Sequence, residues 1–147
     1  MCGIAGIIDY KGNVQLDKLK SMTDSIVHRG PDGEGHWISD SKKVGFGHRR
    51  LSIIDLSEGG HQPMHFLGRY TITYNGEIYN YLELRTQLES EGVKFKTKCD
   101  TEVLLAMYAK KGVDCLQELD GMFAFAIWDE EKQELFCARD RFGEKPF

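Results

Sequence analysis

Hydrophobic and polar positions along the chain follow two periodicities, which predict a mixture of strands and helices. Residues 4–8 form a short apolar run interrupted by Gly6, which indicates a buried strand. Apolar residues between positions 16 and 26 recur at helical spacing with charged residues between them, so we expect an amphipathic helix there. Residues 70–74 alternate aromatic and β-branched side chains, which is typical of a strand.

The rest of the chain continues this mixture of strands and helices. Further strands are expected at 36–38, 43–48, 49–55, 93–97, 122–128 and 134–138, of which the last two would form a hairpin. Further helices are expected at 81–91 and 102–110, closed by Gly92 and Gly112, with another helical turn or two over 113–119. This pattern predicts an α+β domain in which helices cover the outer faces of the sheets.

The pair Asn75-Gly76 is the strongest short turn signal in the chain, so the strand over 70–74 is expected to stop there. A helix follows instead of a second strand, which would place the pair between a strand and a helix. It would then present a side-chain amide and an unobstructed backbone N–H together, as an oxyanion hole requires. A tight turn with no further role is the alternative. Asp100 is well placed to cap the next helix.

Composition restricts the class of protein. The 147 residues suffice for one domain with a sizeable core, and the net charge of −4 gives no basic excess, which argues against nucleic acid as a partner. No apolar run approaches the roughly 20 residues of a membrane span, and no signal peptide is present, so we expect a cytoplasmic protein without membrane contact. The four cysteines are too widely spaced to favour zinc, and a reducing compartment disfavours disulfides. Cys115 and Cys137 are expected to be small core residues.

Cys2 has two interpretations. It can be an incidental cysteine on the first strand. Alternatively, once Met1 is removed, it can be an N-terminal nucleophile whose own α-amine replaces the separate base of other thiol enzymes. The second interpretation requires loss of Met1, because in the intact chain that amine is part of a peptide bond. A small side chain at position 2 generally permits that removal.

Seven short strings, in order, resemble the class II (N-terminal nucleophile) glutamine amidotransferases, and specifically the glutaminase domain of asparagine synthetases. The resemblance covers essentially the whole chain, so we assign residues 1–147 to one glutaminase domain. It implies a four-layer α-β-β-α sandwich of the N-terminal-nucleophile hydrolase type. The strings are MCGI from Met1, HRGPD from His28, RLSIID from Arg50, YNGEIYN from Tyr74, CDTE from Cys99, GMFAF from Gly121 and RDRFG from Arg139.

The resemblance also implies roles for individual residues in the hydrolysis of glutamine to glutamate and ammonia. Cys2 would be the nucleophile and form a thioester, and Asn75 with Gly76 would stabilise the oxyanion. Arg50 would bind the α-carboxylate and Asp100 the α-ammonium group of glutamine. The remaining pocket residues would be Leu51, Ser52, Ile53, Ile54 and Glu77. No histidine is needed as a base, so His28, His48 and His61 are expected to be structural or loop residues. Arg49 is expected to lie on the surface.

Members of this family continue beyond the position of Phe147. We expect further strands of the glutaminase domain and an ATP-dependent synthetase domain that would accept the ammonia, neither of which lies within these residues. The glutaminase domain itself needs no cofactor or metal, whereas ATP and Mg²⁺ belong to the synthetase domain. Glu144 departs from the family, which more usually has an aliphatic residue there. An acceptor other than aspartate, a catalytically silent glutamine-binding remnant, and a homodimer all stay open.

Overall fold

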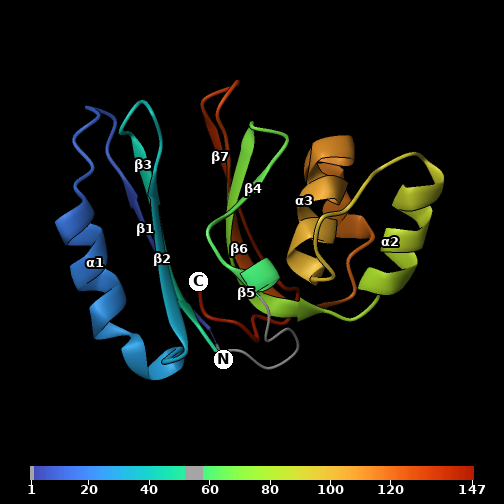
Figure 1. Ribbon diagram of the computed structural model, residues 1–147, viewed down its shortest axis with the longest axis horizontal. Helices are drawn as coiled ribbons and strands as arrows, with labels where there is room; N and C mark the ends of the chain where they lie inside the picture. Colours follow the sequence, from blue (N-terminus) through green and yellow to red (C-terminus); the bar gives the residue numbers. More distant parts are fainter. Residues whose placement is uncertain (1, 52–57) are drawn as a thin grey trace.

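The computed structural model describes residues 2–51 and 58–147 and has four layers of secondary structure (Figure 1). One sheet has the order β1-β3-β2 and the other the order β4-β5-β6-β7, and all of their pairings are antiparallel. The strands are β1 (Gly3–Ile8), β2 (Gly33–Ile38), β3 (Val44–Arg50), β4 (Met64–Phe66), β5 (Tyr70–Ile78), β6 (Gly121–Asp129) and β7 (Glu134–Arg139). The helices are α1 (Leu16–Ser25), α2 (Tyr81–Ser90) and α3 (Asp100–Lys111), with short 3₁₀ turns at Val27–Arg29, Glu58–Gly60 and Gly112–Gln117.

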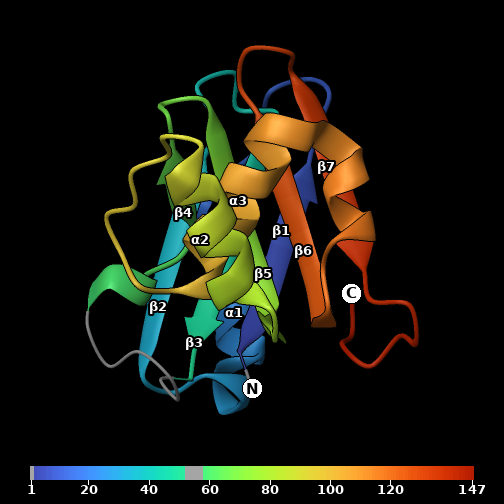
Figure 2. The same ribbon diagram turned by 90° about the vertical axis from the view of Figure 1, so that its right-hand side faces the viewer.

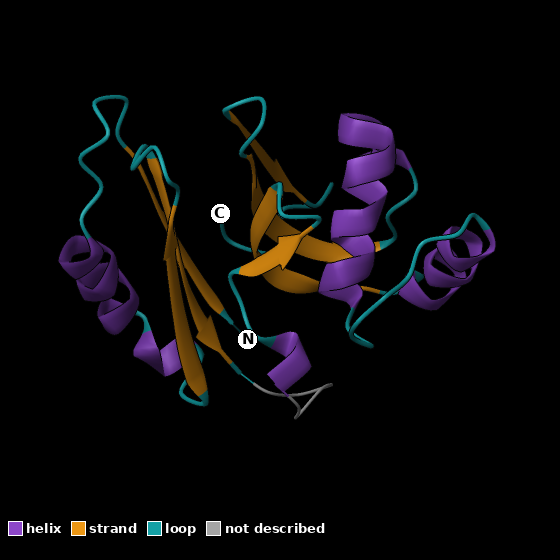
Figure 3. Cartoon of the chain, turned by 45° about the horizontal axis from the view of Figure 1, so that its top comes forward, coloured by secondary structure: helices purple, strands orange, loops and turns teal. Residues whose placement is uncertain are grey.

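The two sheets face each other, and the helices cover their outer sides. Helix α1 lies on the outer face of the three-stranded sheet, while α2 and α3 lie outside the four-stranded sheet (Figures 1 and 2). The tilted view of Figure 3 shows the same succession of helix, sheet, sheet and helices. The predicted α+β class and its α-β-β-α layering are therefore confirmed.

The main hydrophobic core lies between the four-stranded sheet and the helices. Helix α3 is central to it, because every residue from Thr101 to Tyr108 is buried between the sheet and α2. A helix enclosed in this way has no polar stripe, which explains its continuous run of apolar residues. A smaller core between the two sheets contains Val44, Phe46, Ala126 and Trp128. Within the described residues, none of the helices is both long and apolar enough to cross a bilayer.

An apolar cavity of about 270 Å³ lies between the sheets, beside β1 and β7. These are the strands at one edge of each sheet in the described chain. The walls of the cavity are formed by five residues of β1 and two of β7, together with single residues of β3, β5 and β6 and with Phe147. They comprise Ile4, Ala5, Gly6, Ile7, Ile8, Phe46, Thr73, Ala126, Leu135, Cys137 and Phe147.

The strand β5 does not stop at Asn75-Gly76, and the turn predicted there is wrong. It continues to Ile78 because β6 pairs with every residue of it, including Asn75 with Ala124 and Gly76 with Phe123. The chain turns at Tyr79 and Asn80 instead. There the Asn80 side chain accepts a hydrogen bond from the Asp120 N–H at 3.1 Å and donates one to the Glu118 carbonyl at 2.8 Å.

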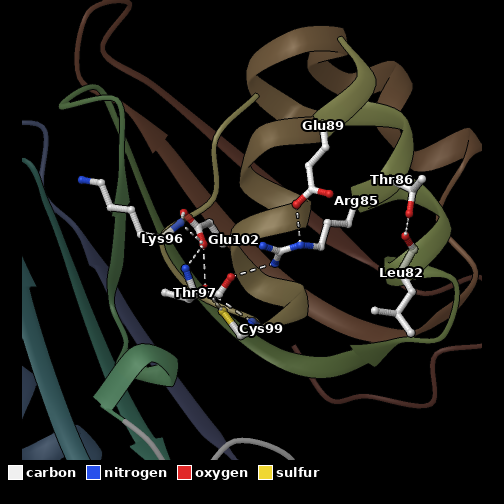
Figure 4. A network of polar contacts seen from close by, with 8 residues as sticks. All are labelled: Leu82, Arg85, Thr86, Glu89, Lys96, Thr97, Cys99 and Glu102. Carbon is white, nitrogen blue, oxygen red and sulfur yellow. Dashed lines mark hydrogen bonds and ion pairs between the residues drawn. The ribbon is translucent and has the colours of Figure 1, made fainter. Parts of the chain in front are cut away.

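The segment 93–97, predicted as a strand, contains no strand. Its backbone N–H groups are bound by a carboxylate instead of a neighbouring strand. The buried Glu102 side chain accepts hydrogen bonds from the Lys96 N–H at 2.9 Å and from the Thr97 N–H and hydroxyl at 2.7 Å each (Figure 4). Arg85 donates a further bond to the Thr97 carbonyl at 2.7 Å. Side chains of α2 and α3 therefore hold this loop.

Three smaller expectations also differ from the structure. Cys99 occupies the cap position of α3 and Asp100 is its first residue, so the capping role predicted for Asp100 is wrong.

Cys115 is buried as expected, but Cys137 is exposed on β7. The strand predicted at 49–55 ends at Arg50 as part of β3, and residues 52–55 lie outside the described residues. The helices 81–91 and 102–110 and the hairpin 122–138 are confirmed within one or two residues.

The loop after β7 is organised by one buried carboxylate. Asp140 accepts four backbone hydrogen bonds, from the N–H groups of Phe142, Glu144, Lys145 and Phe123, at 2.9–3.3 Å. Burial raises the pKa of the Asp140 carboxyl, but the four donors outweigh it and lower the pKa to about 2. The ionised carboxylate therefore stabilises the folded loop.

We expect Asp140→Asn to lower the melting temperature at neutral pH, because an amide NH₂ cannot accept the bonds made to one of the two carboxylate oxygens. The folded pKa of about 2 lies below the unfolded value of about 3.9, so the carboxylate stabilises the fold fully above about pH 5. That contribution is lost as the pH falls through about 4 towards 2. Thermal denaturation from pH 7 to pH 2 should show the gap between variant and wild type closing. Asp40→Asn, in an exposed turn, is the control; a gap independent of pH would contradict the prediction.

Candidate functional site

Cys2 lies directly before β1 at the end of the three-stranded sheet, and its thiol contacts the segment that follows β3. The Leu51 N–H points at the Cys2 sulfur at 3.4 Å, and the sulfur lies 3.8 Å from the Leu51 carbonyl oxygen. Cys2 is partly exposed and is not in a disulfide. The sulfur is thus held against the backbone of Leu51.

The register of β1 and β3 places Cys2 and Arg50 at the same end of the sheet. Gly3 pairs with Arg49, so the residues one step further along, Cys2 and Arg50, leave the sheet side by side. The loop containing His28 to Asp32 fixes this end: the Arg29 side chain donates to the Cys2 carbonyl at 3.2 Å, and the Asp32 N–H donates to the Arg50 carbonyl at 3.0 Å. The polar residues of this loop therefore anchor the strand ends.

Two glycines allow close approach around Arg50. A methyl group on Gly30 would lie 2.3 Å from the backbone carbon of Arg49, so the loop and β3 can be in contact only because Gly30 has no side chain. A methyl group on Gly60 would lie 2.6 Å from a guanidinium nitrogen of Arg50. The Arg50 guanidinium thus passes directly over Gly60, which leaves the guanidinium little freedom on that side.

Alternation along β5 sends neighbouring side chains to opposite faces of the sheet. Tyr74 belongs to the core beneath α2 and α3, as Ile72 and Ile78 do. Thr73 faces the other sheet, because its hydroxyl donates to the Gly47 carbonyl at 3.2 Å. Asn75 therefore points into the space between the sheets, towards the sheet that carries Cys2. It is 4 % exposed, and no side-chain hydrogen bond within the described residues involves it.

Gly76 is required for steric reasons that the sequence does not reveal. A methyl group on Gly76 would lie 2.4 Å from the Met122 carbonyl oxygen and 2.8 Å from Cε2 of the Tyr74 ring. The ring of Tyr74 and the strand β6 both occupy the space where a side chain would stand. Gly76 thus lets β5, β6 and Tyr74 pack together at this end of the sheet.

Asp100 begins α3, and its carboxylate is turned towards β5. One oxygen, Oδ2, accepts hydrogen bonds from the Tyr74 hydroxyl at 2.7 Å and from the Ile78 N–H at 3.1 Å. Burial raises the pKa of the Asp100 carboxyl above its ordinary value, whereas the bonds from Tyr74, Ile78 and the first turn of α3 oppose that rise.

Tyr74 connects the separate parts of the site. Its side chain is 3 % exposed, and burial raises the pKa of its phenol well above the usual range. The negative charges of Asp100 and Glu77 raise the pKa further, and Asp100 is in direct contact with the hydroxyl. Sequence analysis gave Tyr74 no role in the site, and its contact with Asp100 is visible only in the structure.

The remaining predicted residues are the pocket residues that follow Leu51, the removable Met1 and three histidines. Met1, Ser52, Ile53 and Ile54 lie outside the described residues. His48 is structural as predicted: it is buried and lies 3.2 Å from the Tyr74 carbonyl, and burial lowers its pKa to about 4, so the ring is neutral. His28 and His61 are exposed.

Arg49 is not a free surface residue, contrary to expectation. Its side chain is only 12 % exposed, pairs with Asp24 and with Glu34 at 3.0 Å, and donates to the Thr23 carbonyl at 3.2 Å. It joins α1 to β2, and no pattern local to Arg49 could have revealed partners so distant in sequence. In the described parts of the chain, no group of three or more His, Cys, Asp or Glu residues is arranged to hold a metal.

We expect Glu102→Gln to release the loop 93–99, because the Thr97 N–H and hydroxyl would then face an NH₂ group instead of an acceptor. Loss of hydrogen bonds to a buried charged group costs about 1–3 kcal/mol. Denaturant titration should show a loss of this size, and hydrogen exchange at Lys96 and Thr97 should accelerate. Glu134→Gln, which alters an exposed carboxylate on β7 away from this loop, should change neither. Unchanged exchange in Glu102→Gln would contradict the role of this carboxylate.

Comparison with known proteins now identifies the family. The model of the glutamine amidotransferase domain matches residues 1–147. The chain is 47 % identical over 164 residues to a putative glutamine-hydrolysing asparagine synthetase of Methanocaldococcus jannaschii, covering 100 % of this chain and 31 % of that protein. It is 47 % identical over 152 residues to asparagine synthetase 3 of Bacillus subtilis, named as glutamine-hydrolysing, covering 100 % of this chain and 24 % of that protein.

Among solved structures, glutamine phosphoribosylpyrophosphate amidotransferase from B. subtilis superposes with a TM-score of 0.70 at 26 % identity, covering 97 % of this chain and 37 % of that one. Compared with the two asparagine synthetases above, the chain spans only about a quarter to a third of their length. The match of the family model to the whole chain, with the two relatives at 47 % identity, shows that the chain belongs to the glutamine amidotransferase family and is homologous to the glutaminase portion of asparagine synthetases.

Proposed function

We propose that this chain hydrolyses the side-chain amide of glutamine to glutamate and ammonia through a thioester on Cys2. The observation that carries the proposal is the convergence of Cys2, Arg50, Asn75 and Asp100 at one end of the sandwich. These residues come from four separate segments, yet together they offer a nucleophile, an amide donor and two opposite charges. That set matches an amino acid whose side chain ends in an amide.

The thiol of Cys2 is the nucleophile in this proposal, and its own α-amine is the base. The sulfur attacks the amide carbon and its proton passes through the amine to the leaving nitrogen, so that ammonia departs and a thioester forms. Water then cleaves the thioester, which releases glutamate and restores the thiol. Thiols and α-amines in water differ in pKa by about one unit or less, so proton transfer between them costs little. The Leu51 N–H holds the sulfur in place at 3.4 Å.

The oxyanion formed in each step would be bound by the Asn75 side-chain amide and the Gly76 N–H. Asn75 suits this role because it is held on a rigid strand, points towards the sheet of Cys2 and makes no side-chain hydrogen bond within the described residues. Donors that are already oriented stabilise developing charge without reorganisation, which is why such groups contribute strongly to catalysis.

The two charged groups of glutamine would be bound by Arg50 and Asp100. A guanidinium can bind a carboxylate through two parallel hydrogen bonds, and Gly60 keeps the Arg50 guanidinium close to the loop beneath it. Asp100 would bind the α-ammonium group. Leu51 and Glu77 would complete the pocket, as would Ser52, Ile53 and Ile54, which lie outside the described residues.

Beyond this chain, we propose that the ammonia is passed to a synthetase portion that makes asparagine from aspartate. The support is that both relatives are named as glutamine-hydrolysing asparagine synthetases and are much longer than this chain. ATP and Mg²⁺ would act in that portion and not in residues 1–147, and a homodimer stays an expectation.

Glutamate release from glutamine tests the proposal. We expect wild-type protein to release glutamate, Cys2→Ala to release none, and Cys137→Ala, which alters an exposed cysteine on β7, to match wild type. Intact-mass measurement of the active protein should show that Met1 is absent. Glutamate release by Cys2→Ala, or full activity with Met1 retained, would refute the mechanism.

Asn75→Ala should lower kcat by a factor of about 10²–10³ and leave KM for glutamine nearly unchanged, because the lost donor acts mainly on the oxyanion. Steady-state kinetics measure both constants. Titration calorimetry on Cys2→Ala, with and without Asn75→Ala, measures glutamine binding without turnover. A loss of binding as large as the loss of kcat would show that Asn75 holds the substrate and not the oxyanion.

A further inference from the structure

We propose that Tyr74 is a positioning residue that determines specificity: its hydroxyl orients Asp100 so that the site selects amides carrying an α-ammonium group. This inference rests on the proposed function and deepens it. It assigns to the side chain that contacts Asp100 a role in choosing the substrate.

The contact between Tyr74 and Asp100 is direct and short. The hydroxyl donates to Oδ2 of Asp100 at 2.7 Å, and the Ile78 N–H donates to the same oxygen at 3.1 Å. Two donors that approach one oxygen from β5 fix both the position and the rotation of the carboxylate. The backbone N–H alone would restrain one direction and leave the carboxylate free to turn about that bond.

Tyr74 is itself held on all sides, so its hydroxyl is a rigid support. The backbone N–H of Tyr74 donates to Oε1 of Gln62 at 2.7 Å, and its backbone carbonyl oxygen lies 3.2 Å from Nε2 of His48. The edge of its ring fills the space above Gly76, where even a methyl group would lie within 2.8 Å of it. The side chain is 3 % exposed, so water cannot easily replace the bond to Asp100.

The charges of the two groups also favour a hydrogen bond from the Tyr74 hydroxyl to an ionised Asp100. A carboxylate must be ionised to attract an ammonium group, yet burial raises the pKa of Asp100. The bond from Tyr74 is the largest influence that lowers it again. The phenol remains a donor because burial, and after it the charge of Asp100, raises its own pKa.

The consequence is a defined preference between two substrates. Glutamine and 4-carbamoylbutanoate have the same amide and carboxylate, but the second lacks the α-amino group. Only glutamine would use Asp100, so only glutamine would depend on the orientation that Tyr74 imposes. A defect confined to glutamine separates this role from a general effect of Tyr74 on folding or on Cys2.

The test is the pair of substrates applied to Tyr74→Phe. We expect kcat/KM for glutamine to fall about tenfold or more through KM, with kcat little changed, since a hydrogen bond to a charged group is lost. The value for 4-carbamoylbutanoate should stay the same. Tyr70→Phe is the matched control, because Tyr70 is a buried tyrosine on the same strand. It packs against Tyr108, which lies towards the opposite end of α3 from Asp100. The control variant should behave as wild type with both substrates.

A second variant tests the inference without altering Tyr74. Asp100→Asn should show the same selective loss for glutamine, and adding Tyr74→Phe to it should cause little further loss, because both changes remove one interaction. Calorimetry on the Cys2→Ala background should give the same ranking of glutamine affinities without turnover. Additive losses in the double variant would overturn the inference.

The outcomes separate this inference from the proposed function. If wild type hydrolyses glutamine but Tyr74→Phe loses both substrates equally, or neither, the positioning role is refuted while the glutaminase assignment survives. If wild type releases no glutamate and Cys2→Ala binds no glutamine, both proposals fail. If glutamine binds without turnover, the calorimetric ranking decides the role of Tyr74 alone.

Discussion

The half of the candidate site that lies on the four-stranded sheet depends on the pairing of β5 with β6. This pairing covers nine residue pairs from Tyr70–Asp129 to Ile78–Gly121 and keeps β5 extended through Asn75-Gly76. A strand that is extended at this point sends Tyr74 to the helical side and Asn75 to the opposite sheet. The first reaches Asp100 on α3 and the second faces the sheet that ends at Cys2. Had β5 turned at Asn75, neither relation would exist.

The sequence predicted the fold well where the signal is local and less well where distant residues decide. Amphipathic spacing was sufficient for α1 and α2, and alternating residues around a turn were sufficient for the hairpin of β6 and β7. The Asn-Gly pair was misjudged because a long pairing with β6 outweighs a local preference for a turn. The segment 93–97 was misjudged because the partner of its backbone is the Glu102 side chain and not a strand.

The candidate site was predictable to the extent that its residues stand in recognisable strings. Cys2, Arg50, Asn75 and Asp100 each belong to such a string, and the structure gathers them at one end of the sandwich. Tyr74 opens one of these strings, yet its contact with Asp100 spans 26 positions and is invisible without the fold. Arg49 was misjudged for the same reason, since its partners Asp24 and Glu34 lie on other elements.

The loop after β7 shows how little of a sequence such a structure constrains. Its shape is imposed by the Asp140 carboxylate, which binds the backbone N–H groups of Phe142, Glu144 and Lys145 and none of their side chains. The side chain of Glu144 is exposed, so this loop uses the backbone of that residue and not its side chain. Its side chain can therefore change while the path of the chain is preserved.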